Sequence, residues 1–282
     1  MKILSLVKKD MEFNQGLHSL LGVLKTIAVS EFHVLEKKMQ AFEKFSQTLE
    51  GFLELIDVRY FHHPFVNPAR RAQGIVAVTS EKGLLGGLNN QVMAAACNEL
   101  TKKKGKLFVV GERGELFVRE RNIAAVAFPA IQDEERFSQA VQLRNYLFSE
   151  VGKGEIGALK IVYPRAISFT VQRVEIMDVL PYTPKKTKPA EREYFLLNTI
   201  WESNPEEILE YIVYLLMAQL IYEVFGWSRL AELAARFVHL EESSQKLQDL
   251  NQKLRLEYFR IRHELVDRNM RELFAARALF SH

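Results

Sequence analysis

The residues most suggestive of chemistry are three glycines that follow an apolar run, in the stretch TSEKGLLGGLNNQV. Gly83, Gly86 and Gly87 have the spacing G-x-x-G-G, and a helical pattern starts near Asn89. A strand that leads through glycines into a helix can hold phosphate on backbone N–H groups. This spacing, however, matches neither the dinucleotide pattern G-x-G-x-x-G nor a P-loop. We therefore predict a structural tight turn, in which glycines supply positive φ and allow close backbone approach.

Other patterns for catalysis or metal binding are missing from the sequence. G-x-S-x-G, H-E-x-x-H and C-x-x-C do not occur. His62 and His63 adjoin Pro64 at an expected helix end, but no further ligands at matching spacing accompany them. Cys97 is the only cysteine, which excludes an internal disulfide. We expect no catalytic residue, no cofactor and no bound metal in this chain.

Composition and charge exclude several classes of protein. The chain has 282 residues, of which 48% are hydrophobic, so it can bury a sizeable core. Its formal charge of +3 is too small to indicate a nucleic-acid-binding protein. The most apolar stretch, residues 211–222, is followed at once by Glu223, whereas a membrane-spanning helix needs about 20 apolar residues. We therefore expect no nucleic-acid partner and no direct insertion into a membrane.

The elements that position these residues fall into three parts. Residues 1–63 lack proline and carry apolar residues at helical spacing, which predicts a long helix. Residues 70–193 alternate short runs rich in Val, Ile and Phe with polar helical stretches. This alternation is typical of a Rossmann-like α/β domain with a mostly parallel sheet, and the last run favours an antiparallel edge strand. Residues 204–282 are again helical, with neither glycine nor proline after Gly226.

Both terminal parts carry apolar stripes with steps of mostly three, four or seven residues. The C-terminal stripe gives a near-heptad seam of Leu240, Leu247, Leu250, Leu254, Tyr258, Ile261 and Leu265. The N-terminal stripe begins with Leu17, Leu20, Leu24 and Ile27.

A continuous helix from Trp227 to the last residue is about 84 Å long. A compact globule of this chain length is only about 48 Å across. We therefore predict that the two stripes pack together as a long antiparallel coiled coil, with a break near Ser243 and Ser244 as an alternative. Residues 1–63 then pair with residues 204–282.

Several stretches resemble the gamma subunits of F-type ATP synthases, and the resemblance runs nearly from end to end. GIVAVTSEKGLLGGLNNQV is similar to the strand and turn that this family carries as S-D-R-G-L-C-G-G-L-N. EYFRIRHELVDRNMRELFAARAL is similar to the ending Y-N-K-x-R-Q-x-x-I-T-x-E-L-x-E-I, and LKTIAVSEF to M-x-x-V-A-A-S-K-M. Ahead of that ending, Ser228, Glu232 and Arg236 fall in register with the C-terminal helix of the family.

The resemblance implies a central-stalk rotor rather than a catalyst. In this family the terminal helices form a coiled coil inside a ring of alpha- and beta-type subunits, where the chemistry takes place. The α/β domain lies at the foot, beside an epsilon-type subunit and the membrane rotor ring of c-type subunits. Rotation couples transmembrane ion flow to ATP synthesis or hydrolysis. The chain is then a peripheral protein at the cytoplasmic face of the cell inner membrane.

Four residues are carried over as contacts between rotor and ring. Arg262 matches the arginine of Y-N-K-x-R-Q, and His263 stands where the family usually has glutamine. Leu24 and Lys25 lie in the N-terminal segment that faces the same region. The T-Q-K-I-T-K run of the family is replaced here by LHSLLG, and the following lysine by Glu31. These departures indicate a divergent or alternate form of the gamma subunit.

Two other functions fit the residues alone. A non-rotary adaptor, built from a coiled coil and an α/β head, has the same expected architecture without rotation. A nucleotide-binding α/β protein uses the glycine turn to hold phosphate. Association with P-loop ATPase subunits favours the rotor over the adaptor, whereas tight binding of ATP, ADP or NAD by the isolated chain favours the nucleotide-binding protein.

Overall fold

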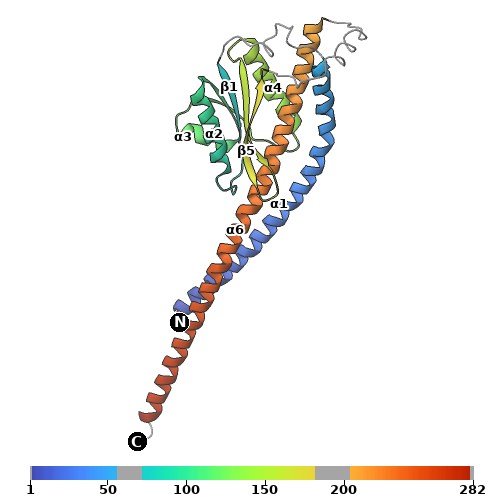
Figure 1. The fold of residues 1–282 in the computed structure, drawn as a ribbon. Helices are drawn as coiled ribbons and strands as arrows, with labels where there is room; N and C mark the ends of the chain where they lie inside the picture. Colours follow the sequence, from blue (N-terminus) through green and yellow to red (C-terminus); the bar gives the residue numbers. More distant parts are fainter. Residues whose placement is uncertain (1, 56–71, 182–203, 280–282) are drawn as a thin grey trace. The chain divides into compact units, whose positions relative to one another are not determined.

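The computed structural model describes residues 2–55, 72–181 and 204–279 (Figure 1). The histidine pair at positions 62 and 63 and the proline- and lysine-rich linker after residue 181 lie outside these ranges. The chain divides into two compact units. Unit 1 consists of residues 1–28 and 237–282, and unit 2 of residues 29–236.

Two long helices begin and end the described chain. α1 (Lys2–Leu55) has 54 residues and α6 (Pro205–Leu279) has 75. α6 continues without interruption through the serine pair, where the Ser243 hydroxyl donates to the His239 carbonyl oxygen at 2.8 Å. Serine can make this bond inside a continuous helix. The predicted long terminal helices are therefore confirmed, and the alternative break does not occur.

In unit 1 the two helices run antiparallel. Lys25 Nζ lies 2.6 Å from Glu241 Oε2, and His18 Nε2 lies 2.9 Å from Gln248 Nε2. A step of seven residues down α1 thus corresponds to a step of seven residues up α6. This pairing brings N-terminal residues of the chain against residues near its C-terminus.

The seam of unit 1 consists of buried and half-buried residues whose positions alternate in steps of three and four. In α1 they are Leu4, Val7, Met11, Asn14, His18, Leu21, Lys25 and Ala28. In α6 they are Leu240, Ser244, Leu247, Asn251, Leu254, Tyr258, Ile261 and Leu265. The coiled-coil pattern is therefore present in both helices.

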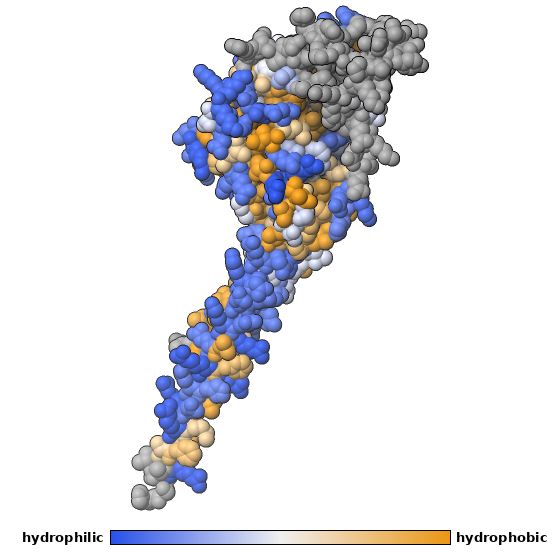
Figure 2. All heavy atoms as spheres, viewed as in Figure 1, coloured by the Kyte–Doolittle hydropathy of each residue, from blue (hydrophilic) through white to orange (hydrophobic). Residues whose placement is uncertain are grey.

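Two details of the predicted seam are wrong. Leu250 is exposed, and Asn251 takes its place in the seam. Leu17, Leu20 and Ile27 are also exposed, because the seam of α1 passes through the residues next to them. Polar residues occupy several seam positions, so the apolar residues alone do not trace the seam. Figure 2 accordingly shows apolar side chains, in orange, among hydrophilic ones on the surface of this helix pair.

Unit 2 contains a five-stranded sheet in the order β3-β2-β1-β4-β5. The strands are β1 (Gln73–Val78), β2 (Gly105–Val110), β3 (Ala125–Phe128), β4 (Ala158–Ala166) and β5 (Gln172–Leu180). The first four pair in parallel, and β5 pairs antiparallel with β4 at the edge. The mostly parallel sheet and the antiparallel edge strand are confirmed. β1 is buried throughout, which explains its continuous apolar run.

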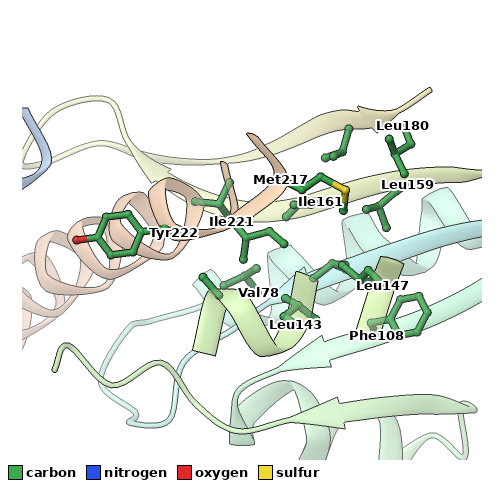
Figure 3. Close-up of a cluster of buried hydrophobic side chains, with 14 of the residues drawn as sticks. Val78, Phe108, Leu143, Leu147, Leu159, Ile161, Leu180, Met217, Ile221 and Tyr222 are labelled. Atoms are coloured by element: carbon green, nitrogen blue, oxygen red, sulfur yellow. The ribbon is translucent and has the colours of Figure 1, made fainter. Parts of the chain in front are cut away.

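Helices cover both faces of this sheet. α2 (Leu88–Lys102) and α3 (Glu112–Glu120) pack over a cluster that contains Ile75 and Ala77 of β1. α4 (Arg136–Gly152) and the first part of α6 pack over the cluster of the opposite face, which contains Val76 and Val78 (Figure 3). Successive β1 residues thus face different layers, as expected of a strand buried on both sides.

By length and composition alone, α6 is apolar enough to cross a membrane, although the sequence was expected to contain no such helix. Of its apolar window, 56% is buried inside the protein. Leu209, Val213, Met217 and Ile221 of α6 belong to the cluster that packs on the sheet. Contact with the sheet therefore accounts for the apolar character of this segment.

The two long helices also meet within unit 2. Phe32, Leu35 and Met39 of α1 share a buried cluster with Leu230, Leu233 and Ala234 of α6. A side chain at Gly226 would place its Cβ 2.1 Å from the Met39 sulfur. Glycine at this position therefore allows α1 to approach α6 closely.

Candidate functional site

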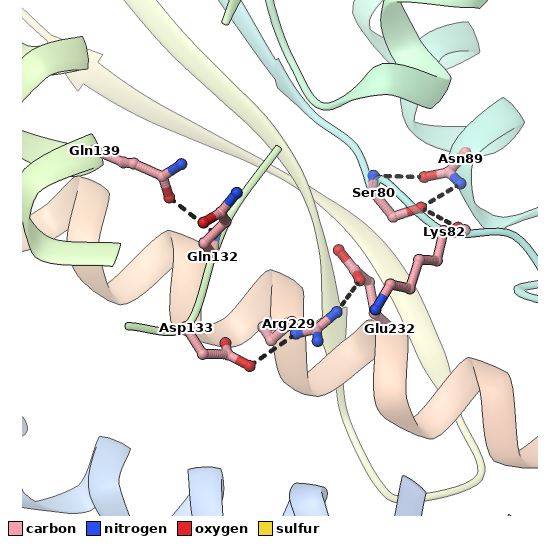
Figure 4. Close-up of polar contacts among 8 residues, drawn as sticks. All are labelled: Ser80, Lys82, Asn89, Gln132, Asp133, Gln139, Arg229 and Glu232. Atoms are coloured by element: carbon pink, nitrogen blue, oxygen red, sulfur yellow. Dashed lines mark hydrogen bonds and ion pairs between the residues drawn. The ribbon is translucent and has the colours of Figure 1, made fainter. Parts of the chain in front are cut away.

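The glycine turn follows the carboxyl end of β1 and is held by a pair of side chains. Asn89, in the first turn of α2, accepts a hydrogen bond from the Ser80 backbone N–H at 3.1 Å. Its side-chain amide donates to the Ser80 hydroxyl oxygen at 2.8 Å, and that hydroxyl donates to the Lys82 carbonyl oxygen at 2.8 Å (Figure 4). The two ends of the turn are thus tied to each other.

The three glycines of the turn have different backbone environments. Gly86 has a φ of 59°, a conformation that favours glycine. Gly87 has a φ of −91° and is the N-cap of α2. At Gly83 a Cβ would lie 3.0 Å from the Arg113 guanidinium. The other positive φ in the turn, 65°, belongs to Leu84, which the sequence does not distinguish from an ordinary leucine.

A second close contact, which the sequence reasoning missed, joins β1 to the start of α3. The Thr79 hydroxyl donates to the Val110 carbonyl oxygen at 2.7 Å and accepts from the Gly114 backbone N–H at 2.9 Å. Gly111 has a φ of 99°, and a Cβ there would lie 2.2 Å from the Thr79 carbonyl oxygen. The signal in the sequence was the pair of glycines in VVGERG directly after β2.

The apolar side of the turn packs on the long C-terminal helix. Leu85 and Leu88 form a buried cluster with Ala235 of α6. Full burial of one leucine side chain contributes roughly 1.5–3 kcal/mol. The turn therefore fastens the α/β layer to α6 within unit 2.

The opposite side of the turn borders a hollow of about 460 Å³. Its lining includes Leu84 and Leu116, two arginines, Arg113 and Arg121, and the acidic Glu120, which lies 3.8 Å from Arg121. Guanidinium groups beside apolar surface can hold an anionic group, because they donate several hydrogen bonds in a fixed geometry. Among the described residues, no group of three or more His, Cys, Asp or Glu side chains could hold a metal ion.

Near the turn, α6 carries a cluster of charges that surrounds the buried Glu232 (Figure 4). Arg229 contacts Asp133 at 3.3 Å and Glu232 at 2.9 Å. Burial raises the pKa of Glu232 above its ordinary value, and the positive charge of Arg229 opposes that shift. Burial also lowers the pKa of Arg236, whose Nη2 has no hydrogen-bond partner. The cluster anchors the loop that contains Asp133 to α6.

The four residues expected to contact a ring lie in unit 1, in two separate stretches. Lys25 is turned toward α6, where it pairs with Glu241, and Leu24 is half-buried beside it. Arg262 and His263 are exposed. Arg262 lies 21 residues beyond Glu241, or about 32 Å along the helix. The structure therefore does not bring the two pairs together, and their contact with a ring stays a prediction.

Comparisons with known proteins identify the family to which this chain is similar. A family model described as ATP synthase matches residues 5–279. The ATP synthase gamma chain of Clostridium acetobutylicum is 30% identical over 201 residues, which cover 70% of this chain and 69% of the relative. The gamma chain of Alkaliphilus metalliredigens is 25% identical over 248 residues, with coverage of 85% and 84%.

Solved structures show the same fold. A chain in the Euglena gracilis mitochondrial ATP synthase superposes with a TM-score of 0.66 at 14% identity, and the match covers 99% of this chain and 95% of that chain. A chain in the central stalk and c-ring structure of the Tetrahymena thermophila mitochondrial ATP synthase gives a TM-score of 0.60 at 18% identity, with coverage of 80% and 99%. Because the family model matches nearly the whole chain and the similar relatives are gamma chains, this chain belongs to the gamma-chain family of F-type ATP synthases, the rotor subunits of the central stalk.

Proposed function

We propose that this chain turns as a non-catalytic shaft inside a ring of alpha- and beta-type subunits and so couples transmembrane ion flow to ATP synthesis or hydrolysis. As a gamma chain it is a subunit of the membrane-associated ATP synthase complex. Its other proposed partners are an epsilon-type subunit and the membrane rotor ring of c-type subunits. We place it at the cytoplasmic face of the cell inner membrane, bound through these partners and not inserted.

The observation that carries the proposal is the far end of α6 in unit 1. Every residue from 266 to 277 is exposed, although Val266, Met270, Leu273 and Phe274 are large and apolar. By the pairing of Lys25 with Glu241, α1 reaches its first residues near position 265 of α6. Exposed apolar side chains on an unpaired helix call for a partner that surrounds them. A ring of head subunits is a partner that can surround this end of the helix.

The test is reconstitution with the alpha- and beta-type subunits of an F-type ATP synthase. We expect a head complex that contains one copy of the chain, and ATP hydrolysis that differs between the complex with the chain and the complex without it. The chain alone should hydrolyse no ATP. Failure of the chain to join the head complex would refute the shaft function and favour the non-rotary adaptor.

A second candidate function rests on the hollow beside the glycine turn. Arg113 and the start of α2, which has no side-chain cap, suit a phosphate-bearing ligand, whereas Arg121 is paired with Glu120. Isothermal titration calorimetry of the isolated chain with ATP, ADP and NAD separates this candidate from the shaft. Tight binding of one ligand per chain, abolished by Arg113→Ala, supports it. We expect no such binding from a shaft.

A further inference from the structure

The apolar residues of the seam in unit 1 do not by themselves fix how far α1 lies along α6. Leu240, Leu247, Leu254 and Ile261 of α6 follow one another at intervals of seven residues. A shift of α1 by seven residues along α6 therefore brings it against the next members of the same apolar series. Such a shift moves one helix by about 10 Å relative to the other. Another feature of the seam has to exclude it.

Two asparagines interrupt this repeat at the same level of the seam. Asn14 is four residues from His18, and Asn251 is three residues from Gln248, whose side chain lies 2.9 Å from that of His18. In an antiparallel pair the two asparagines therefore belong to one layer. Asn14 is 8% exposed, and the Asn251 Oδ1 is buried without a hydrogen-bond partner among the described residues. A buried acceptor without a partner destabilises the pair, so this layer does not exist for stability.

A shift of the two helices by seven residues separates the asparagines. In one direction Asn251 comes opposite Leu21, and in the other direction it comes opposite Val7. Neither of these side chains can donate or accept a hydrogen bond, so the buried amide of Asn251 faces an apolar group in both cases. The shift also separates Lys25 Nζ from Glu241 Oε2, which lie 2.6 Å apart in the observed register. Polar residues of the seam thus distinguish the observed register from its two neighbours.

We propose that Asn14 and Asn251, together with the Lys25–Glu241 pair, form a register lock that stops α1 and α6 of unit 1 from sliding past each other by seven residues. A single polar layer can specify the register of a coiled coil at a cost in stability. The lock is a property of the isolated chain. Only its purpose rests on the proposed shaft function, because a two-stranded shaft carries torque only while its strands stay aligned.

The test measures the distance between two spin labels in the isolated chain by double electron–electron resonance. The labels are attached at Ser19→Cys and Asp267→Cys, two exposed positions, in a Cys97→Ala background. By the contacts of the seam Ser19 is level with Leu247, and Asp267 lies about 30 Å farther along α6. A shift by seven residues changes this offset by about 10 Å. Dilution with unlabelled chain restricts the signal to distances within one molecule.

Two labelled variants are compared with the labelled wild type. The apolar-seam variant replaces the polar residues of the lock by leucine: Asn14→Leu, Lys25→Leu and Asn251→Leu. The matched control replaces exposed polar residues of the same helices: Gln15→Leu, Lys246→Leu and Gln252→Leu.

We expect one population of distances in the wild type and in the control. The apolar-seam variant should show a further population, displaced by about 10 Å, because its seam no longer distinguishes the registers. Its melting temperature should rise by a few degrees, since leucine fills these positions without leaving a buried polar group unpaired.

A single population at the wild-type distance in the apolar-seam variant would overturn the register lock. A lower melting temperature with that same distance would show that the polar layer stabilises the helix pair instead. These outcomes are separate from those that test the shaft function. If the chain fails to join the head complex, the shaft function falls, and the distances in the isolated chain still decide whether the lock exists.

Discussion

At the scale of single residues, the glycine turn works through a few backbone positions. Gly86 supplies a positive φ, and the Asn89–Ser80 hydrogen bonds close the turn. Leu85 and Leu88 then reach Ala235 of α6. The turn thus combines a left-handed backbone position at a glycine with an apolar contact that fastens β1 and α2 to the helix.

Replacing Gly86 with alanine should destabilise the protein by about 1–2 kcal/mol, because a Cβ disfavours the left-handed conformation. Asparagine tolerates this conformation better, so Gly86→Asn should cost less than Gly86→Ala. Urea unfolding of both variants provides the measurement. Equal stability of Gly86→Ala and the wild type would show that the turn does not depend on the positive φ.

Glu99 of α2 connects two lysines and should make stability depend on pH. Its carboxylate pairs with Lys102 and, at 2.8 Å, with Lys160 of β4. Hydrogen bonds from these lysines lower the pKa of Glu99 below its ordinary value of 4.5. An acid whose pKa falls on folding contributes stability above its unfolded-state pKa and loses it as the pH falls through its folded-state pKa.

Glu99→Gln should therefore destabilise unit 2 by about 1 kcal/mol at pH 7. The difference in unfolding free energy between variant and wild type should shrink as the pH falls below 4.5. Glu99 of the wild type then becomes protonated and loses its charge, so that it is neutral like the glutamine of the variant. Urea unfolding at several pH values measures this trend, with exposed Glu120→Gln as the control. A difference that stays constant down to pH 3 would contradict the ionic role.

At the scale of elements, the seam of unit 1 decides which leucines hold the helices together. Leu240 is 1% exposed and Leu250 is 46% exposed, although both are leucines of the same helix. The apolar stripe in the sequence includes both. Only the pairing with α1 determines that Leu240 is buried and Leu250 is exposed.

Leu240→Ala should cost about 2–5 kcal/mol of unfolding free energy, because it leaves a cavity in the seam. Leu250→Ala should change stability by less than about 0.5 kcal/mol, as expected at an exposed position. Chemical denaturation of the two variants tests the assignment of the seam directly. A larger loss from Leu250→Ala than from Leu240→Ala would show that the register is wrong.

At the scale of the whole molecule, α1 and α6 provide all the described residues of unit 1 as well as part of unit 2. The last turns of α6 make no buried contact with the rest of the chain, since residues 266–277 are exposed. We therefore expect their apolar side chains to contribute to binding of a partner and not to folding of the isolated chain.

Ending the chain at Leu265 should leave its unfolding free energy unchanged to within about 1 kcal/mol. The same truncation should weaken assembly with the alpha- and beta-type subunits and lower the ATPase activity of the complex. Differential scanning calorimetry and reconstitution measure the two effects on the same preparation. A large drop in the melting temperature of the isolated chain would mean that the last turns stabilise the fold.

The sequence by itself determined the helix–sheet–helix order, the mostly parallel sheet and the two long helices. Residues 1–63 lack proline, residues 227–282 lack both glycine and proline, and alternating buried runs need no long-range information. Only the tertiary structure decided which faces meet. Asn14, His18 and Lys25 lie in the seam, whereas Leu17, Leu20 and Ile27 remain exposed. A helix with two apolar faces can bury only one of them against a single partner helix, and that choice depends on α6.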